Sequence, residues 1–333
     1  MLFRSIITLC VVVAFFALSI VFINASATTN EENKETETAN VTPIATNESV
    51  THSDDAIDNE QSKSIPLKHK KINSKKDLYS KVLNSIDYYN EVSGEIKTNM
   101  LNKKDETIKY NVNMEESKAY QYVTGENFDE EVYVTDDNIF TFDNLSRTYT
   151  VDAAVSKSEE NNEELGKLNP SDRIKYTTAG GEKIYEKDEA STAEGALIPI
   201  YYYRDDPTNI HYSSTVSLFP QEMAFGFLSN ESLWNITQQT DLLGRKCTVV
   251  EGETDKDYGQ KLNIQRFEMI IDDESGIILN FKGYDENENL TNYISTKQIS
   301  FSCRGIKKLD INNYKEYNLN NQIDTGNSYE DNP

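Results

Sequence analysis

A segment that is apolar on nearly every side constrains this chain more than any other feature. Residues Met223 to Leu228 read MAFGFL, and a helix without a polar face must be covered by other elements all round. Pro220 suits the first position of this helix, because its missing N–H costs nothing there. Asn230 is predicted to end the helix in a left-handed turn. The rest of the chain should therefore form an apolar enclosure for residues 220–228.

Most of the remaining chain shows the alternation that is typical of β-strands. Ile108, Tyr110 and Val112 alternate with polar residues, which is the period of a strand with one buried and one solvated face. The connections are short and rich in Asp, Asn and Gly, and such connections permit only antiparallel neighbours. Further strands are predicted over residues 117–124, 131–135, 139–142, 147–151, 196–203, 246–251, 262–271, 277–284 and 290–301. In the 170–196 stretch, Gly180-Gly181 is predicted to form a hairpin turn between short strands.

A helix is predicted at the start of the globular part. Ser74 can cap it, and Leu78, Val82, Ile86 and Tyr89 fall on one face at helical spacing. Residues 156–169 are acidic and polar without apolar anchors, so they are expected to form a mobile surface excursion. Together these patterns predict an α+β fold in which a curved antiparallel sheet, an incomplete barrel, wraps over a few helices.

The chain before residue 75 is expected to be a targeting segment followed by a tether. An apolar run over residues 5–23 follows Arg4, and Ala25-Ser26-Ala27 fits the small-x-small rule for signal peptidase. The run is near the roughly 20 residues that span a bilayer, so an uncleaved N-terminal anchor is the alternative. The predicted parts are a signal peptide or anchor (1–27), a disordered acidic tether (28–74), the folded domain (75–317) and a disordered tail (318–333).

The charge and the cysteines narrow the environment and the partners. The formal net charge is -23, and removal of residues 1–27 would take away only Arg4 and leave -24. This charge argues against a nucleic-acid partner and against simple electrostatic adhesion to anionic lipid. Cys247 and Cys303 remain in the mature chain. A disulfide between them suits an oxidising compartment, and two small buried apolar side chains are the alternative.

The sequence contains no recognisable reaction chemistry. It lacks a helix with paired metal-binding histidines, a Gly-x-Ser-x-Gly nucleophile turn, a phosphate-binding Gly-rich loop and a Cys-x-x-Cys pair. His211 is the only histidine in the predicted domain, and one histidine without carboxylate or thiolate partners does not make a zinc site. The protein is therefore predicted to be a binding protein without a metal or cofactor. An extracellular hydrolase is the weakest alternative.

The candidate ligand-binding residues lie around the apolar helix. Aromatic and sulfur-containing side chains of this stretch suit a hydrophobic pocket, although a filled core would look the same in sequence. Two arginines at junctions between a turn and an apolar strand could hold an acidic ligand group or close a loop by bonding carbonyl groups. These candidates are Phe219, Met223, Phe225, Phe227, Trp234, Arg204 and Arg245.

The order of elements and one local motif also suggest a family. Leu243-Gly244-Arg245 precedes a Val-Val-Glu-Gly strand, and the segment starting at Phe267 reads FEMIIDDESGIIL, with an acidic turn, a glycine and an apolar triplet after an Ile-Asp step. Over about residues 77–301 the chain resembles the LolA/LolB lipoprotein carriers and the N-terminal domain of RseB-like regulators. The resemblance implies a half-barrel with helices as a lid over an apolar cavity.

The resemblance also implies partners. These are an apolar ligand, such as a lipid or an acylated protein, or a membrane protein of the anti-sigma type bound by RseB-like members. The Asn-, Lys- and Tyr-rich composition suggests an AT-rich, Gram-positive source, and the long acidic tether differs from the short leader of a periplasmic shuttle. We therefore expect an extracytoplasmic protein, secreted or anchored at the outer face of the cytoplasmic membrane, that binds lipid or lipoprotein or senses the state of the envelope.

Overall fold

A computed structural model describes residues 72–317, apart from residues 101–103, 155–158, 179–180, 182, 191–192, 194, 208 and 304. Every described residue belongs to one unit of the chain, Lys63–Pro333. The predicted signal peptide, all but the last residues of the tether and the predicted tail lie outside the described residues. Within the described part of the chain, no helix is long and apolar enough to cross a membrane.

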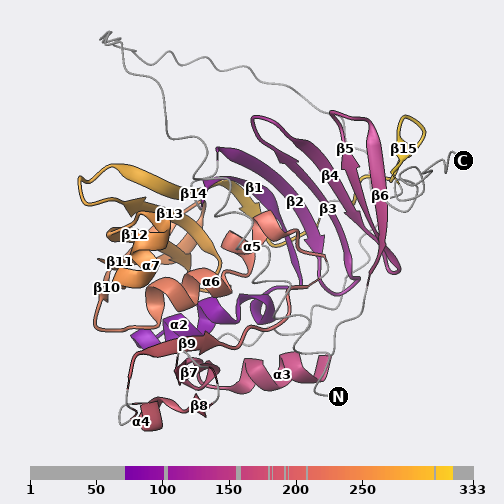
Figure 1. Ribbon diagram of the computed structural model, residues 1–333. Coiled ribbons are helices and arrows are strands. Elements are labelled where there is room, and N and C mark those ends of the chain that lie inside the picture. Colours follow the sequence, from indigo (N-terminus) through magenta and orange to yellow (C-terminus); the bar gives the residue numbers. More distant parts are fainter. Residues whose placement is uncertain are drawn as a thin grey trace, which may run out of the picture. The chain divides into compact units, whose positions relative to one another are not determined.

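One large curved sheet forms the framework of this unit (Figure 1). Its strands are β1 (Glu91–Asn99), β2 (Glu106–Asn113), β3 (Lys118–Thr124), β4 (Asp129–Val134), β5 (Asn138–Asp143), β6 (Thr148–Ala153), β10 (Trp234–Leu242), β11 (Arg245–Glu253), β12 (Arg266–Asp272), β13 (Ile278–Tyr284), β14 (Leu290–Ser300) and β15 (Lys315–Glu316). They lie in the order β10-β11-β12-β13-β14-β1-β2-β3-β4-β5-β6-β15.

The sheet is antiparallel and open. Every neighbouring pair is antiparallel except β15 and β6, which run parallel over two residues. The outermost strands, β10 and β15, stand at opposite ends of the strand order. The predicted fold class, an incomplete barrel of antiparallel strands wrapped over a few helices, is therefore confirmed.

Two hairpin meanders, β1–β6 and β10–β14, meet at the centre of the sheet. The joint is the antiparallel pair β1 and β14, in which Ser93 lies opposite Ser300. Strand β1 was missing from the sequence prediction, because its residues EVSGEIKTN have too few apolar side chains to show a clear period. It is identified as a strand only through its partners β14 and β2 on either side.

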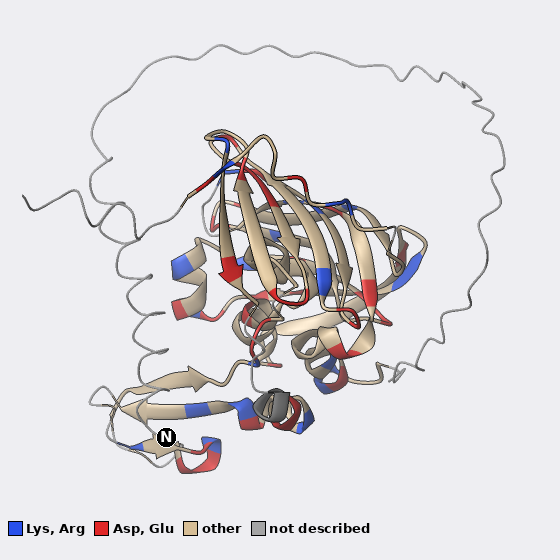
Figure 2. Ribbon diagram, turned by 90° about the vertical axis from the view of Figure 1, so that its right-hand side faces the viewer, with Lys and Arg blue, Asp and Glu red and all other residues tan. Residues whose placement is uncertain are grey.

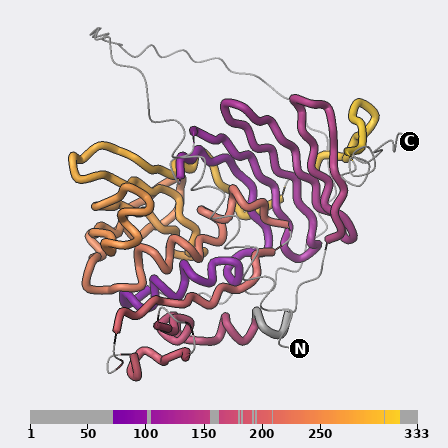
Figure 3. The backbone as a smooth tube through the Cα atoms, in the orientation of Figure 1, coloured from indigo at the N-terminus to yellow at the C-terminus, as the bar shows by residue number. Residues whose placement is uncertain are grey.

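The helices that the sheet curves around come from distant parts of the chain. They are α2 (Lys75–Leu83), α5 (Tyr212–Leu218) and α6 (Gln221–Met223), and α6 continues as a π-helical turn over Ala224–Leu228 (Figures 1 and 3). The Ser74 side chain caps α2 as predicted, accepting from the Asp77 N–H at 3.1 Å. The predicted helix over residues 220–228 is correct in place. Sequence reasoning missed the separate helix α5 before it, which His211 caps.

Residues 159–203 form a second, smaller layer, which we call the insertion. It contains α3 (Glu159–Lys167), β7 (Ile174–Thr178), β8 (Ile184–Tyr185), α4 (Lys187–Ala190) and β9 (Leu197–Tyr201), and its sheet has the order β8-β7-β9. The predicted excursion at 156–169 is thus corrected, because residues 159–167 are helical. An exposed Glu163–Lys167 pair one turn apart supports this helix. The predicted hairpin turn is confirmed, with β7 and β8 antiparallel.

Charged residues of both signs are distributed over the strands and loops of the unit (Figure 2). The apolar residues divide into two buried clusters instead. One joins α2 and the π-helical turn to strands β10–β14, and the other joins the end of α5 to strands β1–β4. Asn230 differs from its prediction, since it is not among the residues with a positive φ. Its side-chain oxygen accepts from the Ser232 N–H and hydroxyl instead.

Candidate binding site

The aromatic residues predicted around the apolar helix are all buried. Phe225 and Phe227 lie in the π-helical turn and are 1% and 2% exposed, and Trp234 at the start of β10 is fully buried. The indole N–H of Trp234 donates to the Leu228 carbonyl at 3.1 Å, which ties the strand to the end of the helix. The segment 223–228 is thus covered on every side, as its composition predicts.

The two phenylalanines point to opposite sides of the helix. The ring of Phe227 contacts the sheet, with Phe267 and Phe281 both at 4.9 Å between ring centroids. The ring of Phe225 contacts the insertion, with Tyr201 at 4.9 Å and Tyr203 at 5.1 Å. The helix is therefore the middle of three layers, and each face has its own aromatic contacts.

Phe219 and Met223 belong to different buried clusters. Met223 belongs to the same cluster as Phe225, whereas Phe219 belongs to the cluster on the β1–β4 side. The predicted aromatic set therefore does not line one continuous surface. Tyr258, on a helix that the sequence did not indicate (α7, Lys256–Leu262), joins the first cluster. Gly226 permits this contact, because a Cβ there would lie 2.1 Å from the Tyr258 ring.

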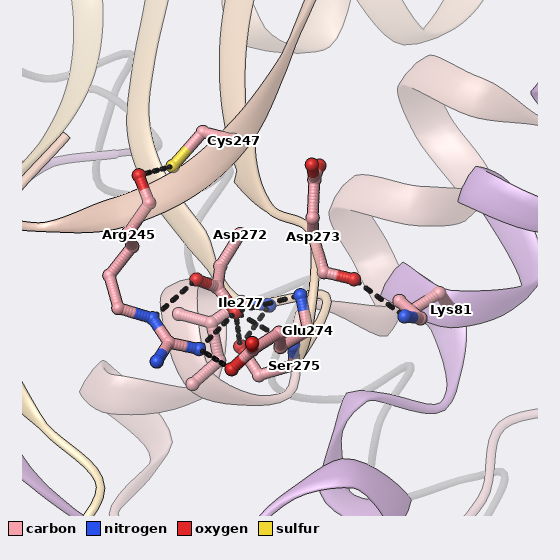
Figure 4. A network of polar contacts seen from close by, with 8 residues as sticks. All are labelled: Lys81, Arg245, Cys247, Asp272, Asp273, Glu274, Ser275 and Ile277. Carbon is pink, nitrogen blue, oxygen red and sulfur yellow. Dashed lines mark hydrogen bonds and ion pairs between the residues drawn. The ribbon is translucent and has the colours of Figure 1, made fainter. Parts of the chain in front are cut away.

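Arg245 is held by carboxylates of the protein itself (Figure 4). Its Nε donates to Asp272 at 2.7 Å, and its Nη2 donates to Asp272 at 3.1 Å and to Glu274 at 2.8 Å. Asp272 is fully buried and also accepts from the Ser275 N–H and hydroxyl, both at 2.7 Å. Arg245 therefore fixes the turn after β12, and its ligand-binding role stays a prediction.

Opposing effects act on the pKa of Asp272. Burial by itself raises it, but the hydrogen bonds from Arg245 and Ser275 outweigh burial and hold the pKa below its ordinary value. The same turn is also fixed to helix α2, since the Lys81 ammonium donates to the Asp273 carbonyl at 2.6 Å. The acidic run Asp272-Asp273-Glu274 is therefore explained by the turn, as the sequence indicated.

Arg204 lies at the base of the insertion, directly after β9. Its Nη1 and Nη2 donate to the two carboxylate oxygens of Asp87, at 2.8 Å and 2.9 Å, and Nη1 also donates to Asn84 at 3.2 Å. The guanidinium is 8% exposed, whereas the Asp87 side chain is 45% exposed. This contact closes the insertion against the segment that follows α2.

Sequence reasoning missed a second buried arginine, Arg173, which lies at the same base of the insertion, directly before β7. It is fully buried and donates to the Tyr202 carbonyl at 2.8 Å, to Asn84 at 3.3 Å and to Gln221 at 2.6 Å. Burial first, and then the charge of Arg204, lower the pKa of Arg173 to about 10. Nothing in the local sequence Pro170-Ser171-Asp172-Arg173 distinguishes it from a surface arginine.

Gln221 connects the two arginines to the helix layer. Its side-chain oxygen accepts from Arg173 and from the Arg204 N–H at 2.8 Å, and its Nε2 donates to the Arg204 carbonyl at 2.8 Å. Gln221 is buried at the first position of α6, directly before the exposed Glu222 and the apolar run, and it was not singled out from the sequence.

The two cysteines are free. Cys247 is buried in β11, and Cys303 lies after β14, where its thiol donates to the Val112 carbonyl at 3.0 Å. The disulfide stays a prediction. Cys247 fits the alternative of a small buried side chain, whereas Cys303 is only partly buried. Burial raises the pKa of Cys247 to about 12 and that of Cys303 to about 11.

No group of three or more metal-ligating side chains occurs in residues 72–317 where the structure describes them. His211 caps α5 through its Nδ1, which accepts from the Ser213 N–H at 3.3 Å. His211 thus has a structural role at the start of α5.

Fold and site define an open antiparallel half-barrel with a helix layer on its inner side. No family model and no curated protein matches the chain. Solved structures with a similar arrangement include LprF from Mycobacterium bovis (9% identity, TM-score 0.35, covering 72% of this chain and 98% of that one). A putative outer membrane lipoprotein-sorting protein domain from Vibrio parahaemolyticus is also similar (9%, 0.23, 72% and 97%).

The MucA/MucB complex of Pseudomonas aeruginosa is a third such structure, with 12% identity and a TM-score of 0.33, covering 69% of this chain and 58% of that one. The chain thus spans less than two thirds of that MucB chain. Because the TM-scores are low, these similarities carry no argument about function, and the half-barrel is established by the strand pairing of this chain.

Proposed function

We propose that this protein is an exported, non-enzymatic binding protein whose half-barrel takes up an apolar ligand, a lipid or the acyl chain of a lipoprotein, beside the helix that follows Pro220. The ligand would replace aromatic contacts of this helix. Such a replacement gains about 25 cal/mol for each Å² of apolar ligand surface removed from water.

One observation supports this proposal above the others. The π-helical turn Ala224–Leu228 is an apolar layer between two sheets, with aromatic rings on both faces. Movement of this layer away from either sheet would expose two matching aromatic surfaces. π-Helical turns are wider than α-helical ones and frequently occur at functional sites.

The first test is native mass spectrometry of the full-length protein purified from its own envelope, before and after organic extraction. We expect a bound lipid that is lost on extraction, and binding of added hexadecanoic acid to the extracted protein. A protein that is purified without lipid and binds neither hexadecanoic acid nor lipopeptides would exclude the proposed lipid-binding function.

Point variants locate the ligand. Phe225→Leu and Phe227→Leu each remove the aromatic ring from one face of the helix. At least one of them should weaken the binding of hexadecanoic acid several-fold. Phe142→Leu is the matched control, because Phe142 is an equally buried ring on the distant strand β5, in contact with Tyr133, Tyr149 and Tyr314. If a folded Phe225→Leu, Phe227→Leu double variant binds like the wild type, the ligand does not lie beside this helix.

A regulatory interaction module is the second candidate, and strand β10 supports it. β10 is an outer strand of the large sheet, and its residues 235–239 are exposed on both faces. Such an edge can accept an added strand from a partner protein. Its partner would be a membrane protein at the outer face of the cytoplasmic membrane.

Cross-linking separates this candidate from the first. A photoreactive residue at position 237, which the strand bulge leaves unpaired, should cross-link to a membrane protein even in delipidated envelopes. The control is position 290, which is equally exposed but lies at the start of the interior strand β14. Equal labelling from both positions would rule out strand addition at β10.

A further inference from the structure

The two arginines at the base of the insertion lie against a single amide oxygen. Arg173 Nη1 and Arg204 Nη1 both donate to Asn84 Oδ1, at 3.3 Å and 3.2 Å. Arg173 precedes β7 and Arg204 follows β9, so the chain enters and leaves the insertion sheet through this cluster. Both side chains are buried, at 0% and 8% exposure.

The cluster has more positive than negative charge. Asp87 is the one carboxylate that forms an ion pair with either arginine among the described residues, and it binds Arg204. The three acceptors of Arg173 are a carbonyl and two amide oxygens, which are neutral. A buried guanidinium with only neutral acceptors is costly, because attraction to a neutral dipole does not fully replace its hydration.

Polar hydrogens in the cluster remain unused. A guanidinium has five N–H groups, and Arg173 donates through three of them. Arg204 Nε and the Tyr79 hydroxyl are buried and have no hydrogen-bond partner within the described part of the chain. Burial raises the pKa of Tyr79 far above its ordinary value while the Arg173 charge acts to lower it, so the hydroxyl keeps its proton and lies within the field of Arg173.

The surroundings of these donors are aromatic. The Arg173 guanidinium lies 5.4 Å from the Phe225 ring centroid, and Tyr79 contacts the same ring edge-on at 6.4 Å. Tyr201 and Tyr203 of the insertion contact Phe225 from its other sides. Unused cationic donors beside an aromatic layer suit a molecule with an anionic group at one end and an apolar body.

We propose that Arg173, Arg204 and the Tyr79 hydroxyl bind the anionic headgroup, a carboxylate or a phosphate, of an amphiphilic ligand whose apolar chain lies along Phe225 and the insertion. This inference rests on the proposed function. It adds the chemical class of the ligand's headgroup and the face of the helix along which the ligand lies. The headgroup replaces Asn84 and Gln221 as acceptors of Arg173. A carboxylate or phosphate accepts the same hydrogen bonds and adds the attraction of opposite charges, which the neutral amide oxygens lack, so the exchange favours the anion.

Entry of the ligand requires the insertion to move. Arg173 is fully buried, and the bonds from Arg173 and Arg204 to Asn84, Asp87 and Gln221 hold the insertion against α2 and α6. A headgroup that takes over the arginine donors loosens the same bonds. Headgroup binding and opening of the insertion are therefore one event.

The test compares ligands on the full-length, lipid-extracted protein by isothermal titration calorimetry below their micelle-forming concentrations. Hexadecanoate should bind at least about tenfold more tightly than hexadecan-1-ol, because a hydrogen bond to a charged group contributes this much. Hexadecyl phosphate should share this preference. Acetate and inorganic phosphate, which lack the chain, should not bind measurably, and their tight binding would show a site for free anions instead.

The Tyr79→Phe variant examines the site itself. It removes only an unpartnered hydroxyl, so the fold should be kept, while hexadecanoate binding should weaken about tenfold and hexadecan-1-ol binding should not change. Tyr110→Phe is the matched control, since its buried hydroxyl is also unpartnered but lies in the cluster on the β1–β4 side.

Besides tight binding of the short anions, three results would overturn the inference, and they have different meanings. Equal binding of acid and alcohol by the wild type would leave the proposed function standing without an anion site. Equal behaviour of the Tyr79→Phe and Tyr110→Phe variants would place the headgroup elsewhere. If no 16-carbon ligand binds, the proposed function fails together with the inference.

Discussion

The turn around Arg245 and the base of the insertion are both fixed by buried arginine contacts, but their charges are balanced differently. At the turn, one guanidinium meets the two carboxylates of Asp272 and Glu274. At the insertion, two guanidiniums lie near one carboxylate, Asp87, which pairs with Arg204, while the acceptors of Arg173 are neutral. The first site has no positive charge left over, whereas the second has one.

This difference separates a structural contact from a candidate for binding. The Arg245 site joins the start of β11 to the turn between β12 and β13, and Asp272 holds that turn through its bonds to Arg245 and Ser275. The insertion site joins segments that are far apart in the chain and leaves buried donors unused at Arg204 and Tyr79. Stability alone explains the first arrangement, and it does not explain the second.

The largest effect is expected from Asp272→Asn. It removes the charge that compensates Arg245 and weakens the hydrogen bonds of the turn, so the free energy of unfolding should fall by about 3 kcal/mol. Glu274 remains as a partner and keeps the loss from being larger. Urea unfolding at pH 7 measures this loss of unfolding free energy. A loss below about 1 kcal/mol would mean that the Arg245–Asp272 pair is not the main support of the turn.

The stability that the Asp272 carboxylate contributes depends on pH. The pKa of Asp272 is lowered in the fold from its ordinary 3.8, so its contribution is complete above that value and is lost as the pH falls through the folded-state pKa. The gap in unfolding free energy between the wild type and Asp272→Asn should therefore be constant from pH 7 to about 5 and shrink below about 4. A gap that stays constant down to pH 3 would contradict the assignment.

A smaller effect is expected from Arg173→Met. In this variant, Arg204 still donates to the side-chain oxygens of Asn84 and Gln221. Only the Tyr202 carbonyl loses its hydrogen bond from an arginine. The free energy of unfolding should fall by about 1 kcal/mol, since removal of an uncompensated charge offsets part of the loss. This gap should not vary between pH 7 and pH 5. A loss as large as that of Asp272→Asn would make the insertion site a structural contact too.

The smallest effect is expected from Tyr79→Phe in the ligand-free protein. The hydroxyl is buried without a partner, so its removal should leave the unfolding free energy within about 0.5 kcal/mol of the wild type or raise it. Thermal unfolding with and without hexadecanoate measures this together with the ligand's stabilising effect. A loss above about 1 kcal/mol without ligand would reveal a hydrogen bond that holds the closed state.

Local patterns predicted much of the fold. The Ser74 cap, the alternation over β2, the Asp272–Gly276 turn and the enclosure of the apolar helix all follow from neighbours in the chain, and all are present. Strand β1 and helix α7 were missed, because their side chains lack a clear period and their structure depends on the elements beside them.

The site was less predictable than the fold. The aromatic residues were found, but their division between two faces and two clusters was not, since composition carries no direction. Arg204 was found from its position between a turn and a strand. Arg173 and Gln221 were not, because a buried arginine and an exposed one look the same in a sequence.

The sequence by itself determined where the chain turns, where strands and helices begin and which segment must be enclosed, because these depend on backbone preferences and on the spacing of apolar side chains. The tertiary structure alone decided that β1 pairs with β14 and that the guanidiniums of Arg173 and Arg204 meet at Asn84. Burial and charge balance belong to groups brought together from distant positions, and no local pattern encodes them.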